Sequence, residues 1–243
     1  MFQVAAFTIL FACSIVFVGC LLNVSSVSAS QPQDQWVAQP FHLVGLAASY
    51  ASAGYSPSQI KAAYNLPSTG GAGTTIAIID VYDTPTIQSD LAVFCNQFGL
   101  PPADLEVHEM PQTSGTNSTW TLETALDVEW AHAIAPQAKI LLVEAQSPSD
   151  DGLLPAVDYA RSRSDVVAIS MSWGGDEFAQ ELSYDYHFTS THGAVFFASS
   201  GDTGAGVSWP ACSPNVVAVG GTTLTLNPDG TVASETLPQG PGD

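Results

Sequence analysis

The sequence predicts an α/β fold in which helices cover both faces of a parallel β-sheet. Short apolar runs alternate along the chain with segments whose apolar residues recur at helical spacing. The runs are continuous rather than alternating, which is typical of strands that are buried on both faces. Of the 243 residues, 46% are hydrophobic and only 11% are charged, so the chain can bury a sizeable core.

Each expected element follows from a local pattern. Ser56 is a good N-cap and Pro57 a good first-turn residue, so a helix is expected to begin there. Strands are expected over the apolar runs 74–83, 138–145, 165–175, 194–202 and 216–226. Further helices are expected over 86–100, 119–136, 153–163 and 184–193.

The first 29 residues have the composition of a secretory signal peptide. Residues 5–22 are apolar and uncharged, and Val27 and Ala29 suit cleavage after Ala29. A retained membrane anchor is the alternative, because the apolar run is long enough to span a bilayer. Export predicts a secreted, extracellular protein, in which Cys95 and Cys212 could form a disulfide. Residues 30–68 are expected to form a leader or loosely ordered arm ahead of a domain over residues 69–243.

The chain is strongly acidic, with four Lys and Arg against 23 Asp and Glu and a formal net charge of −19. This balance excludes nucleic acid as a partner, because phosphates require a basic patch. It also argues against binding to an anionic membrane surface, and a monomer is expected. Two interpretations of the charge remain open. One is a solvated acidic surface, and the other is an acidic working environment in which protonated carboxyls no longer repel one another.

Two carboxylates stand out in the predicted helix 119–136. Glu123 and Asp127 are four residues apart, so their side chains share one face of the helix. Leu122 and Trp130 are among the apolar residues around them. Two carboxyls crowded among apolar groups tend to share a proton, which would suit a general base held by a second carboxyl. An exposed acidic face is the plain alternative.

Other polar residues follow the carboxyl ends of the expected strands, where parallel sheets place their ligand chemistry. Asp80, Asp83 and Glu144 stand at two of these ends, and Asp80 either serves catalysis or caps the loop after it. Asp202 lies between two glycines. It either belongs to a simple turn or, if protonated, donates a hydrogen bond to a developing oxyanion.

Two further features have plain alternatives. Gly174 and Gly175 follow a strand, where they either permit the close approach of an extended peptide or form a turn. His132 is expected to be a core or capping histidine rather than a ligand. The sequence has no H-E-x-x-H motif, Cys-His cluster or complete calcium loop, so no metal site is expected in it.

Six stretches occur in an order that resembles the sedolisin family, the serine-carboxyl peptidases with a subtilisin-like fold. They are "YSPSQIKAAYNLP", "TIAIIDVYDTPTIQSDLAVF", "LETALDVEWAHAIAPQAKILLVEA", "SMSWGG", "ASSGDTGAG" and "SPNVVAVGGTTL". The resemblance implies that Glu123 is the general base, Asp127 orients it and Asp202 is the oxyanion-hole acid. It implies that the substrate cleft is lined by Ser172, Trp173 and Gly174.

The resemblance also implies a secreted serine-type endopeptidase that acts on proteins or peptides at acidic pH, with residues 69–243 forming a partial peptidase domain. Ordinary subtilisins have a related sheet but require a catalytic histidine, and none of the five histidines here has its sequence context. They also have Asn at the position of Asp202.

One departure limits this interpretation. The nucleophilic serine and the calcium-binding loop of the family are expected beyond Asp243, so no cofactor is expected in the 243 residues and the fold is expected to be incomplete at its C-terminus. Without the nucleophile, an acyl-enzyme cannot form. The alternative is therefore an inactive pseudoprotease or a peptide-binding fragment.

Overall fold

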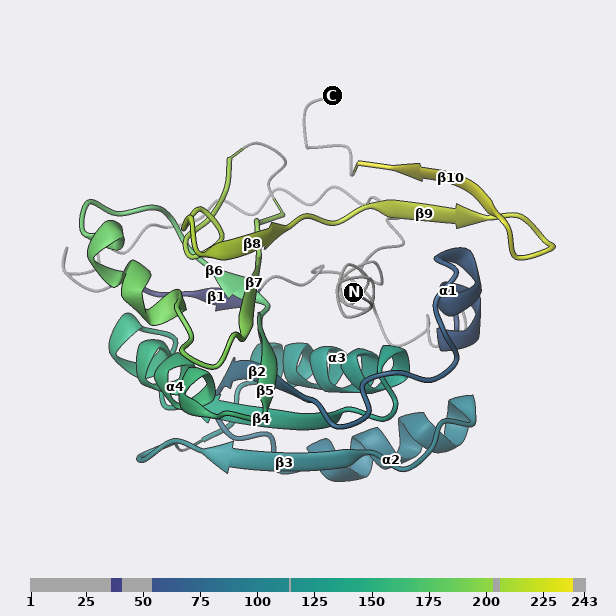
Figure 1. The fold of residues 1–243 in the computed structure, drawn as a ribbon, viewed down its shortest axis with the longest axis horizontal. Coiled ribbons are helices and arrows are strands. Elements are labelled where there is room, and N and C mark those ends of the chain that lie inside the picture. The colour runs from purple at the N-terminus through teal and green to yellow at the C-terminus, as the bar shows by residue number, and fades with distance from the viewer. Residues whose placement is uncertain (1–35, 41–53, 114, 203–205, 238–243) are drawn as a thin grey trace.

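The computed structural model describes residues 36–40, 54–113, 115–202 and 206–237, and its centre is a six-stranded sheet (Figure 1). The strand order is β3-β4-β2-β5-β7-β8, and every neighbouring pair is parallel. The strands are β2 (Thr75–Val81), β3 (Asp104–Glu109), β4 (Lys139–Ala145), β5 (Val166–Met171), β7 (Val195–Ser199) and β8 (Val216–Val219). The predicted parallel sheet is confirmed.

Helices pack on both faces of this sheet, as predicted. Successive side chains of a strand point to opposite faces, so β2 serves two hydrophobic clusters. Ala77 and Ile79 pack with α4 (Asp150–Ser162), while Ile76 and Ile78 pack with α2 (Ile87–Phe98) and α3 (Ser118–Ile134). The short helix α1 (Pro57–Ala63) begins at Ser56 as expected and packs against the end of α3.

Part of the segment predicted to be a loosely ordered arm is built into the fold. The strand β1 (Gln39–Pro40) pairs antiparallel with β6 (Trp173–Gly174), and Ala38 is buried. The Trp36 ring lies edge-on to the Trp209 ring, with their centroids 4.6 Å apart. The signal peptide predicted for residues 1–29 lies outside the described residues. Within those residues, no helix has both the length and the apolar character that a membrane crossing requires.

Three predicted elements differ from the observed ones. The helix expected over 184–193 is instead a 3₁₀-helix over Glu181–Phe188. Its buried side chains, His187 and Phe188, are adjacent, so it lacks the apolar stripe that would hold an α-helix to the core. The run 165–175 breaks at Ser172 between β5 and β6, and the run 216–226 divides into β8 and β9 (Thr223–Leu226).

Besides β1, two further elements were not predicted. The strand β3 is an edge strand with a charged, half-exposed sequence, D-L-E-V-H-E, so it lacks the continuous apolar run used to find the others. The strand β10 (Val232–Thr236) is exposed along its length and forms an antiparallel hairpin with β9, outside the parallel sheet.

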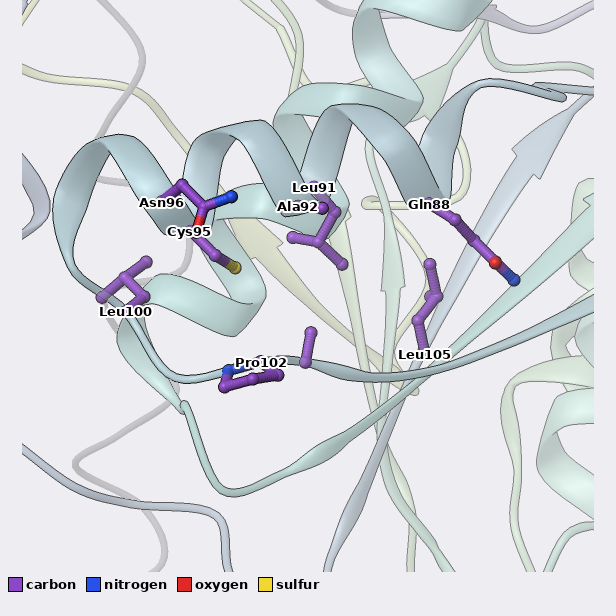
Figure 2. Close-up of a pocket in the computed structure, with 9 residues that line it drawn as sticks. Gln88, Leu91, Ala92, Cys95, Asn96, Leu100, Pro102 and Leu105 are labelled. Atoms are coloured by element: carbon purple, nitrogen blue, oxygen red, sulfur yellow. The ribbon is translucent and has the colours of Figure 1, made fainter.

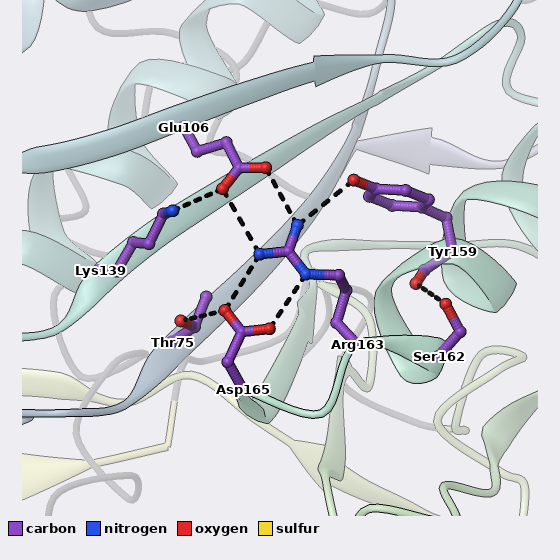
Figure 3. Close-up of polar contacts among 7 residues, drawn as sticks. All are labelled: Thr75, Glu106, Lys139, Tyr159, Ser162, Arg163 and Asp165. Atoms are coloured by element: carbon purple, nitrogen blue, oxygen red, sulfur yellow. Dashed lines mark hydrogen bonds and ion pairs between the residues drawn. The ribbon is translucent and has the colours of Figure 1, made fainter.

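An ion-pair network ties together the amino ends of three strands (Figure 3). Lys139 Nζ lies 2.6 Å from a Glu106 carboxylate oxygen, and Arg163 Nη1 lies 3.0 Å from the other. Arg163 Nε also lies 3.0 Å from Asp165, just before β5. Hydrogen bonds from these cations lower the pKa of both carboxyls to about 2. This network, which we call the amino-end network, anchors β3, β4 and the start of β5.

The two cysteines of the described region are free thiols. Cys95 belongs to the cluster under α2, and Cys212 packs against the cluster on the opposite face of the sheet. The possible disulfide is therefore not formed. His132 is fully buried, with Nε2 2.8 Å from the carbonyl oxygen of Pro101, and it is the core histidine that the sequence predicts.

Candidate active site

Helix α3 carries the two carboxylates that the sequence singled out. Asn117 caps the helix, and its side chain accepts hydrogen bonds from the backbone N–H groups of Thr119 and Trp120. Glu123 lies in the second turn and is 2% exposed. Burial, followed by the nearby charges of Asp127, Asp80 and Asp202, raises the pKa of Glu123 to about 11. The alternative of an exposed acidic face is thus wrong for Glu123.

Asp127 lies one turn further along α3. The residue is half-buried, but its Oδ2 atom is enclosed. The pKa of Asp127 is raised to about 7, because the effect of burial outweighs the opposite effect of the nearby Ser172 hydroxyl. Ser172 comes from the break between β5 and β6, so the predicted cleft residue and the predicted base partner are neighbours.

Asp80 completes the buried group of carboxyls. It lies near the end of β2 on the face that α3 covers, because strand residues alternate and Ile76 and Ile78 point the same way. The Thr124 hydroxyl is close enough to lower the pKa of Asp80, but it donates its proton to the Trp120 carbonyl. Among the described residues, neither Asp80 oxygen accepts a hydrogen bond.

The pKa of Asp80 is raised well above its usual value, first by burial and then by the charges of Asp127 and Glu144. The sequence left open whether Asp80 caps a loop or serves catalysis. Its burial beside Asp127 favours the second interpretation. We call Glu123, Asp127 and Asp80 the carboxyl triad.

Asp202 comes close to the triad from the end of β7, two strands along from β2 in the sheet. It follows β7 in a turn where Gly201 has φ 112°, a backbone conformation that L side chains rarely adopt. A Cβ at Gly201 would also lie 3.0 Å from Ser208 Oγ. Asp202 is exposed, yet its charge contributes to the raised pKa of Glu123. The fold thus brings together four acids from three distant stretches of the sequence.

The three predicted cleft residues lie against the same end of the sheet. Ser172 and Trp173 are buried, and Trp173 Nε1 donates a 2.8 Å hydrogen bond to the carbonyl of Ile79, the residue before Asp80. Trp173 and Gly174 pair with Pro40 and Gln39. An extended segment of the chain's own N-terminal region therefore lies along the strand that was expected to receive a peptide.

A separate pocket lies away from these acids. It has a volume of about 380 Å³. Figure 2 shows that its lining comes from one side of α2 and from the chain leading into β3. None of the predicted site residues lines this pocket. The carboxyl triad therefore belongs to a different part of the molecule.

The triad has a defined chemical capacity. Three crowded carboxyls in a buried place cannot all ionise, so they titrate as a group and share protons. A single negative charge on the group is destabilised by burial, which makes it a strong base. A nearby exposed acid, Asp202, can meanwhile donate a hydrogen bond when it is protonated. This combination suits the activation of a hydroxyl nucleophile.

Comparison with known proteins identifies the family to which this fold belongs. The model of the subtilase family matches residues 112–238, just over half of the chain, which includes α3 and Asp202. A solved structure, "Pseudomonas sedolisin (serine-carboxyl proteinase) complexed with two molecules of pseudo-iodotyrostatin", superposes with a TM-score of 0.68 at 28% identity. The match covers 75% of this chain and 58% of that one. The chain belongs to the subtilase family, and within it to the sedolisin type.

Three curated relatives support the same assignment. Sedolisin of Pseudomonas sp. (strain 101) is 27% identical over 90% of this sedolisin-type chain, and tripeptidyl-peptidase 1 of Dictyostelium discoideum is 28% identical over 76%. Kumamolisin of Bacillus sp. (strain MN-32) is 29% identical over 78%. The matches cover 42%, 34% and 38% of those proteins, respectively, so the chain spans less than half the length of each.

Proposed function

We propose that this sedolisin-type chain is part of an exported serine-type endopeptidase that cleaves proteins or peptides at acidic pH. The observation that carries the proposal is the meeting of the buried carboxyl triad with Asp202 at the carboxyl end of a parallel sheet. Both the sequence pattern and the serine-carboxyl proteinase named in the structural match support this type of chemistry.

In this proposal, each acid has its own task. Glu123 removes the proton from the attacking serine hydroxyl, and Asp127 holds Glu123 and shares the proton with it. Asp80 extends the proton-sharing group into the core. Asp202, when protonated, donates a hydrogen bond to the oxyanion of the tetrahedral intermediate. The attacking serine belongs to the longer protein, after Asp243.

Acidic conditions suit this set of groups for a physical reason. A carboxyl donates a hydrogen bond only in its protonated form, which acid favours, and Asp202 is an exposed carboxyl of this kind. The low content of Lys and Arg leaves a chain that repels itself least in acid.

The substrate in this proposal is an extended peptide. The pairing of Gln39 and Pro40 with β6 supports this, because the β6 edge has the geometry to accept an extended strand. A substrate that uses this edge would displace residues 39–40. The cleft residues Ser172, Trp173 and Gly174 would then contact its backbone.

The test is proteolysis by the full-length protein at about pH 4, close to the pKa of an ordinary carboxyl. Unfolded protein substrate should be cut at internal bonds, and Glu123→Gln should abolish the cleavage. Glu129→Gln is the matched control, because Glu129 lies on α3 and has a pKa raised to about 7 by burial, but its charged neighbour is Asp90. Loss of activity in both variants, or in neither, would contradict the assignment of Glu123.

The same assay separates two alternatives. Release of tripeptides from one end only would indicate an exopeptidase, the activity named for the Dictyostelium relative. Peptide binding without turnover, unaffected by Glu123→Gln, would indicate a non-catalytic peptide-binding protein. The pairing of β1 with β6 is the observation that favours this second function, since an extended segment already lies along that strand.

A further inference from the structure

A second group of acids lies beside the triad, at the ends of β2, β3 and β4. The strand register pairs Asp80 with Glu144 and Glu144 with Glu109. Residues paired in this way stand side by side and point to the same face of the sheet. Asp83 follows β2 by two residues and joins Glu109 and Glu144. We call Asp83, Glu109 and Glu144 the strand-end cluster.

The spacing of the strand-end cluster fits a single ion. One carboxylate oxygen from each residue lies within 4.8 Å of the others. Calcium–oxygen distances are about 2.4 Å, so two oxygens bound to one calcium ion lie at most about 4.8 Å apart. Carboxylate oxygens are also the ligands that hard divalent cations prefer.

Glu144 provides an independent reason to expect a ligand. It is 1% exposed, and its Oε1 atom accepts a 2.8 Å hydrogen bond from the backbone N–H of Thr84. Its other oxygen, Oε2, is buried and has no hydrogen-bond partner among the described residues. A buried carboxylate oxygen without a donor is costly, and a cation between it and two further carboxylates would remove that cost.

The chain's own cations are used elsewhere. Of its four Lys and Arg residues, Lys139 and Arg163 hold the amino-end network, and Arg161 pairs with Asp158. Lys61 donates to the carbonyl of Ser68. The charge of the strand-end cluster therefore has to be met by protons or by an ion from solution.

We propose that Asp83, Glu109 and Glu144 bind a divalent cation, with Ca²⁺ as the preferred ion. The bound ion joins the ends of three neighbouring strands and fixes the segment that follows Asp80. The site is separate from the calcium loop expected beyond Asp243. It is also separate from the proposed proteolysis, because its binding can be measured without a substrate.

The experiment is a calcium titration of the metal-free, full-length protein at neutral pH, in which calorimetry measures the binding. Asp83→Asn and Glu109→Gln should each weaken the affinity of one site by about tenfold or more, because calcium affinity follows the number of charged ligands. Glu109 is exposed, so its replacement leaves the packing of the core intact. Thermal unfolding in the presence and absence of Ca²⁺ provides the second readout, and the stabilisation by Ca²⁺ should fall in both variants.

Asp104→Asn is the matched control, because Asp104 is an exposed acid at the opposite end of the same strand. It should bind Ca²⁺ as the wild type does. The proposal is overturned if Asp83→Asn and Glu109→Gln bind and respond to Ca²⁺ like the wild type. Equal weakening by Asp104→Asn would also overturn it, since calcium would then be responding only to overall surface charge.

Discussion

The pKa values of the carboxyl groups are shifted in opposite directions at the two ends of the parallel sheet. At the amino ends of the strands, Glu106 and Asp165 are paired with Lys139 and Arg163, and their pKa values fall to about 2. At the carboxyl ends, Asp127 and Glu144 have no Lys or Arg partner among the described residues, and burial raises their pKa values to about 7. The same residue types are therefore charged structural groups at one end and proton-holding groups at the other.

This contrast shows how a chain with few basic residues can keep proton-exchanging carboxyls at one edge of its sheet. A carboxyl paired with Arg is locked in its charged form and cannot exchange a proton near neutral pH. A buried carboxyl beside other carboxyls keeps that ability. Because Lys139 and Arg163 are placed at the amino ends, the opposite edge is left free for proton transfer, and we propose that catalysis and cation binding occur there.

The largest expected effect is on catalysis. Asp127→Asn should lower kcat/KM of the full-length peptidase by on the order of 10²–10⁴, because the shared proton that supports Glu123 is lost. Asp165→Asn removes a carboxyl of the amino-end network and should leave kcat/KM nearly unchanged. Steady-state cleavage of a peptide at acidic pH measures both. Similar losses in the two variants would show that the two ends do not differ in function.

The next effect concerns stability and pH. The pKa values of Asp127 and Glu144 are raised in the fold, so their contribution to stability is complete below the unfolded value of about 4 and is lost as the pH rises through about 7. Glu106 and Asp165 act in the opposite direction, and their contribution is lost as the pH falls towards about 2.

Thermal unfolding should therefore give its highest midpoint near pH 4, with a fall on the order of 10 °C by pH 8. A chelator should be present, because a bound cation would mask the effect of the strand-end cluster. Asp127→Asn should reduce the fall. A midpoint that rises between pH 4 and pH 8 would contradict the raised pKa values.

A smaller effect is expected where β6 is tied to the end of β2. Trp173→Phe removes the donor to the Ile79 carbonyl in a fully buried position and should cost about 1–3 kcal/mol of unfolding free energy. Because Ile79 precedes Asp80, the variant should also lower kcat more than it raises KM. Urea unfolding and steady-state kinetics measure the two effects, and Tyr186→Phe, an exposed aromatic, is the control.

The smallest effect is expected in the amino-end network. Arg163→Met should cost only about 1 kcal/mol at pH 6, because partly exposed ion pairs are weak. The difference from the wild type should shrink as the pH falls towards about 2, where Glu106 and Asp165 become protonated. Urea unfolding at several pH values measures this, and a difference that grows in acid would disprove the pairing.

The sequence by itself determined the elements whose patterns are local. The continuous apolar runs of β2 and β4 are buried strands because both of their faces are covered, and the spacing of Glu123 and Asp127 puts them on one side of α3. The position of Asp202 between glycines after a strand was also readable, since backbone conformation at Gly201 depends on neighbours in the chain.

Only the tertiary structure decided which of these groups meet. The strand β3 has no apolar run of its own, and its place beside β4 is what brings Glu109 into register with Glu144. In the same way, Asp80 joins Asp127 because α3 packs across β2, and residues 36–40 join the fold because β6 offers them a free edge. Strand register and helix packing join residues distant in sequence, so no local pattern specifies them.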